Sequence, residues 1–260
     1  MATFYVSYRV NSSNSADTQY EKVNAATQTD AKKIIEARYR GSRVVFPNSP
    51  EFGTFTDPRD GNVYKTVKIG NQVWMAENLR YEGGFAADGR GSIAYSDDSD
   101  LAKIYGRLYT WSGAMNINSK YNKESVPSVL MKKTRKGDYC QGIAPEGWHI
   151  PSKKELETLL RYVKRLTGVC DEGGLSEALR ASGEWEGSES NNVSGFSALP
   201  AGNYGSYYEV FGSLGDDASF WSSTEGYEGL AYRLRVGDGY AYVGSINKYE
   251  VYSVRCLKDN

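Results

Sequence analysis

The stretch FWSSTEGYEGLAYRLRVGDGYAYVGSINKYEVYSVRCLK, residues 220–258, decides the fold of the C-terminal part of this chain. Apolar and polar residues alternate along residues 231–236, where Leu234 and Val236 share one parity and two arginines share the other. Alternation of this kind is typical of a β-strand with one covered face. The turn sequence Gly237-Asp238-Gly239 then predicts a hairpin.

A second alternating segment, residues 240–243, follows the turn and carries a tyrosine at every other position. The two strands therefore present Arg233, Arg235, Tyr240 and Tyr242 together on one face. A tyrosine ring combines a rigid apolar surface with a polar tip and loses little side-chain entropy when it is held. We expect this face to be exposed and to bind a ligand.

The composition is that of a large globular protein. The chain has 260 residues, 40% of them hydrophobic, and its 31 Lys and Arg against 32 Asp and Glu leave a net charge of -1. A chain of this length can bury a core, and a net charge near zero produces no overall electrostatic attraction to nucleic acid. The sequence shows neither a signal peptide nor an apolar stretch long enough to cross a bilayer. We therefore predict no nucleic-acid partner and no membrane insertion.

Three parts follow one another along the chain. Residues 1–47 predict a small ββαβ module, with strands at residues 3–10, 20–23 and 42–46 and a helix that Thr29 caps and Gly41 ends. Residues 48–53 have the composition of a linker. Residues 54–260 form the larger domain. Because the module carries no motif of a catalytic site, we expect it to dock the larger domain to an assembly.

Six motifs stand in order along the larger domain: DPRDGNVYKTVKIGNQVWMAENLRY (57–81), YGRLYTW (105–111), APEGWHIPSKKELETLL (144–160), FSALPAGNY (196–204), FWSSTE (220–225) and YSVRCLKD (252–259). Together they resemble the Fibrobacter succinogenes major paralogous domain family over residues 54–259. That family is similar to the C-type-lectin-like fold of formylglycine-generating-enzyme relatives and of proteins diversified by retroelements.

The resemblance implies an α+β domain of C-type-lectin-like fold, with twisted antiparallel strands and two helices. The residues agree with this expectation. Ser152 followed by Glu155 predicts a capping box at the start of a helix with a leucine-rich stripe. Residues 175–181 predict a second, short helix.

The resemblance also places further segments beside the hairpin, namely the loop at residues 202–208 and Trp221, which belongs either to the core or to the floor of the site. We predict the following ligand-binding residues: Tyr204, Tyr207, Tyr208, Trp221, Arg233, Arg235, Asp238, Tyr240, Tyr242, Asn247 and Tyr249. Aromatic rings with adjacent arginine, aspartate and asparagine accept both sugar faces and protein epitopes.

No catalytic constellation is predicted. His149 is the only histidine, so we expect a structural hydrogen bond at the strand-to-helix corner rather than a triad or a metal site. The carboxylates of Asp97, Asp98 and Asp100, and of the pair Asp216-Asp217, have the chemistry that calcium prefers, but neither segment matches an EF-hand. We assign no metal and no cofactor.

The cysteines Cys140, Cys170 and Cys256 leave two arrangements open: one disulfide with one free thiol, or three buried thiols. The resembled family usually has a cysteine where this chain has Ala144, so a bridge from that position to Cys256 is lost here unless Cys140 substitutes. Formylglycine-generating enzymes hold copper with two close cysteines. Since no second cysteine accompanies Cys256, we expect no oxidase activity.

These observations predict a non-enzymatic ligand-binding protein that recognises a surface protein or a glycan through a C-terminal surface. The resemblance implies that the residues between the fixed motifs are diversified by a retroelement, and that the protein works outside the cell, on a cell surface or a phage virion. Homo-oligomerisation is left open. The alternatives are an oxidase like the formylglycine-generating enzymes, or a degenerate relative of one, and a structural decoration protein.

Overall fold

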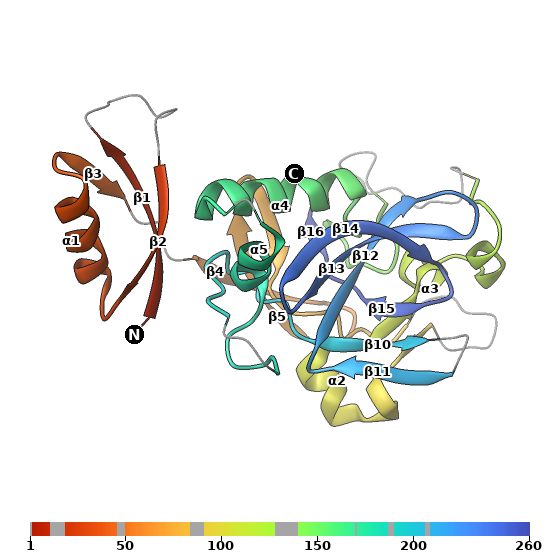
Figure 1. The fold of residues 1–260 in the computed structure, drawn as a ribbon. Helices are drawn as coiled ribbons and strands as arrows, with labels where there is room; N and C mark the ends of the chain where they lie inside the picture. Colours follow the sequence, from red (N-terminus) through yellow and green to blue (C-terminus); the bar gives the residue numbers. More distant parts are fainter. Residues whose placement is uncertain are drawn as a thin grey trace.

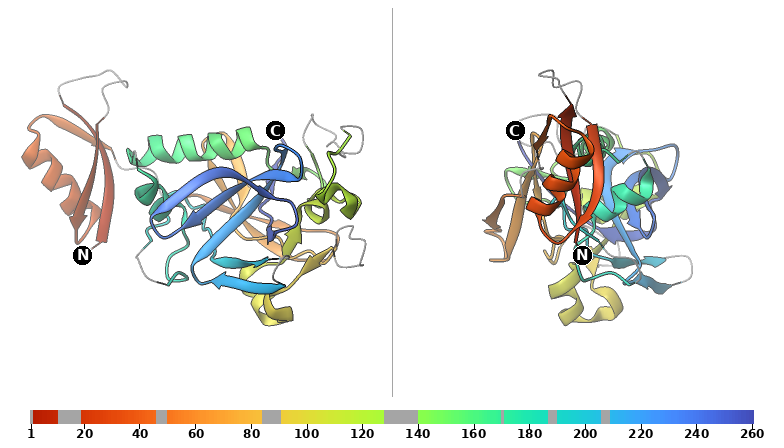
Figure 2. Two further views of the ribbon diagram at one scale, coloured as in Figure 1. Left: turned by 45° about the vertical axis from the view of Figure 1, so that its right-hand side comes forward. Right: turned by 60° about the vertical axis from the view of Figure 1, so that its left-hand side comes forward.

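The computed structural model describes residues 2–10, 19–45, 50–83, 91–127, 140–169, 171–186, 190–205 and 209–260. Its N-terminal module stands to one side of the larger unit (Figures 1 and 2). The module consists of β1 (Ala2–Val10), β2 (Gln19–Ala25), α1 (Gln28–Arg38) and β3 (Ser42–Val45), with the sheet order β2-β1-β3. This is the ββαβ sequence of elements that the alternation predicts.

Helix α1 packs one apolar side against the module's sheet. Ala31 and Ile35 are buried with Val6 and Val23 from the first two strands. The helix begins two residues earlier than predicted, because the Thr27 hydroxyl, rather than that of Thr29, accepts the hydrogen bond from the Asp30 backbone.

The larger unit begins with a five-stranded sheet of order β4-β5-β6-β16-β9. Its strands are β4 (Phe52–Thr56), β5 (Val63–Ile69), β6 (Gln72–Met75), β9 (Trp148–His149) and β16 (Leu257–Lys258). Strand β4 starts at Phe52, inside the interval expected as a linker, because Phe52 and Gly53 already pair with β5. Gly70 takes a φ of 62° in the tight turn between β5 and β6, a conformation that favours glycine.

A second sheet carries the C-terminal hairpin. It contains β7 (Ser92–Ile93), β8 (Leu108–Thr110), β10 (Ala201–Gly205), β11 (Val210–Leu214), β12 (Asp217–Glu225), β13 (Leu230–Gly237), β14 (Tyr240–Asn247) and β15 (Val251–Ser253). The main path runs β11-β10-β15-β12-β13-β14, and β8 joins β15 to β7. The pair β12 and β15 is parallel, whereas the other pairs are antiparallel. The turn at residues 238–239 closes the predicted hairpin.

The helical elements of the larger unit are η2 (Tyr95–Asp97), α2 (Ser99–Tyr105), α3 (Trp111–Met115), η3 (Ser119–Asn122), α4 (Lys153–Thr167) and α5 (Glu172–Leu179). The predicted capping box is present at α4: the Ser152 side chain accepts from the Glu155 backbone, and the Glu155 side chain accepts from the Ser152 backbone. Helix α5 begins at Glu172, three residues earlier than predicted, because Asp171 caps it.

Two apolar cores lie on the two sides of the β12–β14 strands. Phe220, Leu234 and Val236 pack against α4 and α5 in one core, while Trp221 belongs to the other core with Trp111. Arg255, fully buried, connects distant segments by donating to the side chain of Asn78 and to the Ser197 carbonyl. The protein is therefore an α+β protein with mixed sheets. Among its described helices, none combines the length and the apolar character needed to cross a membrane.

Candidate functional site

The register of β12, β13 and β14 places the predicted hairpin residues on one face of the sheet. Arg235 lies between Ser219 on β12 and Tyr242 on β14, and Arg233 pairs with Trp221 in the same way. Directly paired residues point to the same side of a sheet. We call the resulting surface the tyrosine–arginine face; it consists of Asp217, Ser219, Arg233, Arg235, Tyr240 and Tyr242.

Asp217 organises this face. Its Oδ2 atom accepts a hydrogen bond of 2.6 Å from Arg235 Nε and one of 2.9 Å from the Tyr240 hydroxyl, while Oδ1 accepts from Ser219 at 3.2 Å. The Asp217 side chain is 10% exposed and that of Arg235 is 36% exposed. Hydrogen bonds to a charged group are the stronger kind. A largely buried carboxylate therefore holds the arginine and the tyrosine at the surface in fixed positions.

The two hairpin tyrosines have opposite electrostatic surroundings. Burial and the neighbouring Asp217 raise the pKa of Tyr240 to about 12. Hydrogen bonding to Arg235 and the charge of Arg233 lower the pKa of Tyr242. The two rings lie 6.1 Å apart, and the Arg235 guanidinium lies 4.9 Å from the Tyr240 ring centre. The face thus offers two half-buried rings, one beside a carboxylate and one beside guanidinium groups.

Arg233 is a correction to the expected exposure. It is only 6% exposed, and its guanidinium lies 5.5 Å from the ring centre of Tyr252 on β15 and 6.0 Å from that of Tyr242. Its Nε atom is buried and has no hydrogen-bond partner among the described residues. Arg233 therefore lies beneath the surface that Arg235, Tyr240 and Tyr242 form.

Trp221 belongs to the core and is not part of the surface. It is fully buried, its Nε1 donates to the Tyr109 carbonyl at 2.8 Å, and its ring meets that of Tyr252 edge-on at 5.0 Å. Of the two readings of this residue, the structure selects the core. A ligand on the tyrosine–arginine face would not touch it.

Three of the predicted residues lie at the ends of the hairpin. Asp238 stands in the turn and forms an ion pair with the buried Arg180 at 3.5 Å. Asn247 lies at the opposite end of β14, where its side chain accepts from the Tyr249 backbone. Seven residues of strand, roughly 20 Å, separate the two ends. The structure therefore does not bring Asp238 together with Asn247 and Tyr249.

Tyr204 lies on the other side of the sheet. It pairs with Val251 on β15, whereas the next residue, Tyr252, contacts Trp221 and Arg233. Successive residues of a strand point to opposite faces, so the sheet separates Tyr204 from the tyrosine–arginine face. Tyr207 and Tyr208 lie outside the described residues.

His149 makes the structural contacts expected at the strand-to-helix corner. Its Nδ1 lies 2.8 Å from Asp259 Oδ1 and its Nε2 lies 3.1 Å from Glu155 Oε1. Burial opposes the charge of Glu155, but hydrogen bonds from His149 and Ser152 lower its pKa overall. Both imidazole nitrogens are thus engaged, although His149 lines a cavity of about 770 Å³.

Cys140 and Cys256 are free thiols, so Cys140 does not take the place of the missing cysteine at Ala144. Burial raises the pKa of Cys140 to about 11 and that of Cys256 to about 12. The Cys140 sulfur instead contacts the Met115 sulfur at 3.6 Å. Both thiols are therefore protonated at neutral pH. Cys170 lies outside the described residues.

Three of the five aspartates considered for calcium have other roles. Asp98 caps α2, Asp100 forms an ion pair with Lys103 at 2.7 Å, and Asp217 is bound to Arg235. Within the described ranges, no group of three or more histidine, cysteine, aspartate or glutamate side chains is arranged to hold a metal ion.

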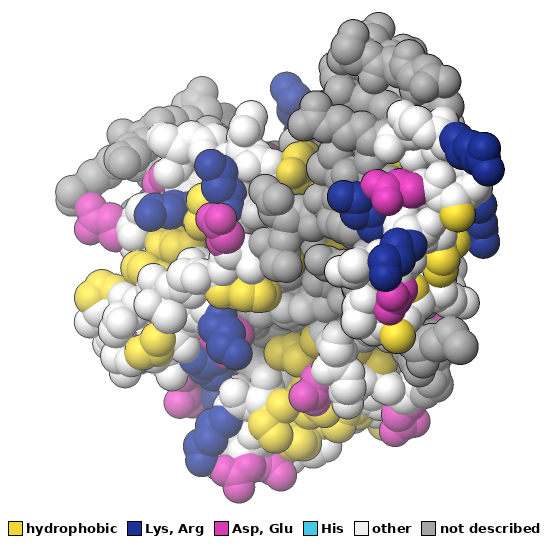
Figure 3. All heavy atoms as spheres, turned by 90° about the vertical axis from the view of Figure 1, so that its left-hand side faces the viewer, with side chains coloured by type: hydrophobic (Ala, Val, Ile, Leu, Met, Phe, Trp, Pro, Cys, Tyr) yellow, Lys and Arg dark blue, Asp and Glu magenta, His cyan; other side chains and the backbone are white. Residues whose placement is uncertain are grey.

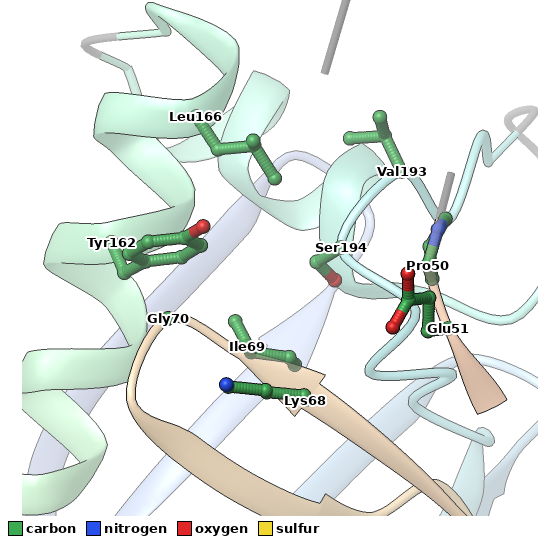
Figure 4. A pocket seen from close by; sticks show the side chains of 9 residues that line it. All are labelled: Pro50, Glu51, Lys68, Ile69, Gly70, Tyr162, Leu166, Val193 and Ser194. Carbon is green, nitrogen blue, oxygen red and sulfur yellow. The ribbon is translucent and has the colours of Figure 1, made fainter. Parts of the chain in front are cut away.

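A further cavity, of about 250 Å³, lies between α4 and the segment that follows the N-terminal module (Figure 4). Tyr162 and Leu166 of α4 face Pro50 and Glu51 across it, and Lys68 lies below. Figure 3 shows the side of the molecule that carries the module, where basic and acidic side chains are interspersed on the described atoms. Neither feature adds residues to the tyrosine–arginine face.

Sequence reasoning missed the organising role of Asp217 and the covering role of Tyr252. The alternation along β12 could have indicated the role of Asp217, because Asp217, Ser219 and Trp221 alternate along the strand and so point to the same face. Lys248 was missed as well: it is 1% exposed, forms an ion pair with Glu225, and lies 4.4 Å from the Trp111 ring centre. No local pattern distinguishes such a buried lysine from a surface one.

The comparisons with known proteins agree with the six motifs. The profile of the Fibrobacter succinogenes major domain matches residues 67–258, an interval that contains the whole tyrosine–arginine face. Searches of curated proteins and of solved structures found no match. Since the matched interval covers well over half of the chain, the chain belongs to the Fibrobacter succinogenes major domain family.

Proposed function

We propose that this protein is a non-enzymatic ligand-binding protein and that the tyrosine–arginine face is its binding site. The observation that carries the proposal is the arrangement of Arg235, Tyr240 and Tyr242 on one face: the buried carboxylate of Asp217 holds Arg235 and Tyr240, and Tyr242 is hydrogen-bonded to Arg235. Binding costs less when the contacting groups are already ordered, because little side-chain entropy is lost on association.

The ligand class that suits this face is a glycan or a protein epitope on a surface. Tyrosine and arginine are the residues that most often dominate binding energy at interfaces. The rings of Tyr240 and Tyr242 offer apolar surface to the CH groups of a sugar or a side chain. Arg235, with a side chain that is 36% exposed, offers hydrogen-bond donors beside them.

The state of the thiols supports a non-enzymatic role over the oxidase alternative. Copper binding by paired cysteines needs thiolates. Burial keeps Cys140 and Cys256 protonated at neutral pH, and the two sulfurs have separate surroundings: Cys140 contacts Met115, and Cys256 lies fully buried near Arg59 and Arg255. A purely structural decoration protein remains the other alternative, and it predicts that no ligand binds this face.

Three finer statements belong to the same proposal. The larger unit has a C-type-lectin-like fold; residues between the fixed motifs are diversified by a retroelement; and the N-terminal module docks the binding domain to a cell surface or a phage virion. The second statement predicts a reverse transcriptase in the encoding locus and a template copy of the 3′ end that differs at adenines. A locus that lacks the reverse transcriptase and the template copy would contradict diversification.

The binding proposal is tested by screening the whole chain against immobilised glycans and surface proteins, followed by alanine substitution. Arg235→Ala, Tyr240→Ala and Tyr242→Ala are each expected to weaken binding of any ligand found by about tenfold or more. Tyr227→Ala is the matched control, because Tyr227 is 83% exposed and lies in the turn between β12 and β13, off the face. Equal affinity of the face variants and the wild-type protein would refute the site.

A further inference from the structure

The far side of the sheet holds a cavity of about 460 Å³ that the hairpin does not reach. It lies between η2 and the strands β7, β8, β10, β11 and β15. Its lining residues are Gly91, Ser92, Ile93, Asp97, Leu108, Thr110, Tyr204, Glu209, Phe211 and Val251. The set combines an apolar and aromatic wall with two carboxylates, and among these described lining residues there is no lysine, arginine or histidine.

The wall of this cavity is built into the fold. Leu108 and Val251 are 1% and 5% exposed and belong to a small core cluster of their own. The ring centre of Phe211 lies 4.9 Å from that of Tyr204 and 4.9 Å from that of Tyr95. Because strand pairing of β10 with β11 sets Tyr204 opposite Phe211, the aromatic surface is fixed in the absence of any ligand.

The two carboxylates at this cavity have no other partner among the described residues. Asp97 and Glu209 are exposed, and neither side chain has a hydrogen bond or an ion pair with another described residue. Their neighbour Asp98, in contrast, caps α2. Arg107 brings positive charge against the wall through a hydrogen bond to Ser92, but its ion pair with Glu82 partly offsets that charge. The described side chains at the mouth of the cavity therefore carry more negative than positive charge.

We propose that this cavity binds an organic ammonium ion, with Tyr204 and Phe211 against its alkyl groups and Asp97 and Glu209 beside its charge. Aromatic faces attract alkylated ammonium groups through the ring quadrupole, and the attraction grows when water is displaced. Among the lining residues that the structure describes, an anion would meet two carboxylates and no cation. A neutral apolar molecule would cover the carboxylates without giving them a partner, which is unfavourable.

The inference does not depend on the function proposed for the hairpin. The sheet separates the two sites, since Tyr204 points away from Tyr252 and Arg233. A substitution that abolishes binding at one site leaves the residues of the other site unchanged. Each proposal can therefore be refuted without refuting the other.

The test compares two probes of the same shape by titration calorimetry of the whole chain. Choline carries a quaternary nitrogen, and 3,3-dimethylbutan-1-ol replaces that nitrogen with carbon. Choline is expected to bind about tenfold or more tightly than its neutral analogue. Equal affinities of the two probes, or no binding of either, would overturn the proposal.

Substitutions then locate the site. Asp97→Asn and Glu209→Gln should each weaken choline binding severalfold and leave the melting temperature unchanged, because both side chains are exposed. Asparagine also tolerates the φ of 54° at position 97. Phe211→Leu should weaken choline binding while the neutral probe changes little. The control is Asp216→Asn, an exposed aspartate outside the lining; an equal loss there would mean a diffuse charge effect and would overturn the site.

Discussion

Asp217 and Arg235 form an ion pair across neighbouring strands, with Arg235 Nε 2.6 Å from Asp217 Oδ2. The same carboxylate oxygen accepts the hydroxyl of Tyr240. Three strand positions are thus joined through one nearly buried group, and the exposed side of the arginine remains available. The tyrosine–arginine face is consequently ordered by the protein before any ligand arrives.

Asp217→Asn tests this organising role. The substitution removes the charge that Arg235 and Tyr240 share, so the free energy of unfolding should fall by about 1–3 kcal/mol. Urea denaturation measures the change. Asp216→Asn, at the exposed neighbouring position, should change stability by less than about 0.5 kcal/mol. Similar effects of the two substitutions would show that Asp217 has no special role.

Tyr240→Phe tests the same contact through its pH dependence. Folding raises the pKa of Tyr240 from 10.0 to about 12, so its hydroxyl stabilises the native state fully below pH 10.0 and loses this effect as the pH rises through about 12. The melting temperature of the wild-type protein should therefore exceed that of the variant near neutral pH, and the gap should close in alkali. A gap that stays constant with pH would contradict the contact with Asp217.

Glu155→Gln is expected to show the opposite pH dependence. Folding lowers the pKa of Glu155 below 4.5, so the carboxylate stabilises the native state above pH 4.5 and loses this effect as the pH falls through its lowered pKa. The variant should be less stable than the wild-type protein at neutral pH and approach it in acid, as measured by urea denaturation. Glu157→Gln, on the same helix and 44% exposed, serves as the control with little effect at either pH.

The thiols provide a test that separates the binding proposal from the oxidase alternative. In a Cys170→Ser background, Cys140 and Cys256 should react slowly with a thiol reagent at neutral pH, because burial raises the pKa of both. Both should react at once in denaturant. Rapid reaction of the native protein, or stoichiometric copper binding to it, would favour the oxidase alternative.

Local patterns were sufficient for the secondary structure that surrounds the site. The capping box at Ser152 and Glu155, the hairpin around Asp238 and the shared face of Arg233 and Tyr242 all follow from residues close in sequence. Such features depend on side-chain periodicity and on hydrogen bonds to the adjacent backbone, both of which are readable along the chain. The family membership likewise rests on the order of its motifs.

Which of the predicted site residues are exposed, and which of them lie together, depended on contacts between segments that are distant in sequence. Strand β15 inserts between β10 and β12, so Tyr252 covers Arg233 while Tyr204 turns to the opposite side and joins Phe211. Parity along a strand determines which residues share a face, but not whether another strand or loop covers that face. Only the packing of the sheet, which burial of Trp221 and Val251 stabilises, decided that Arg235 is at the surface and Arg233 is beneath it.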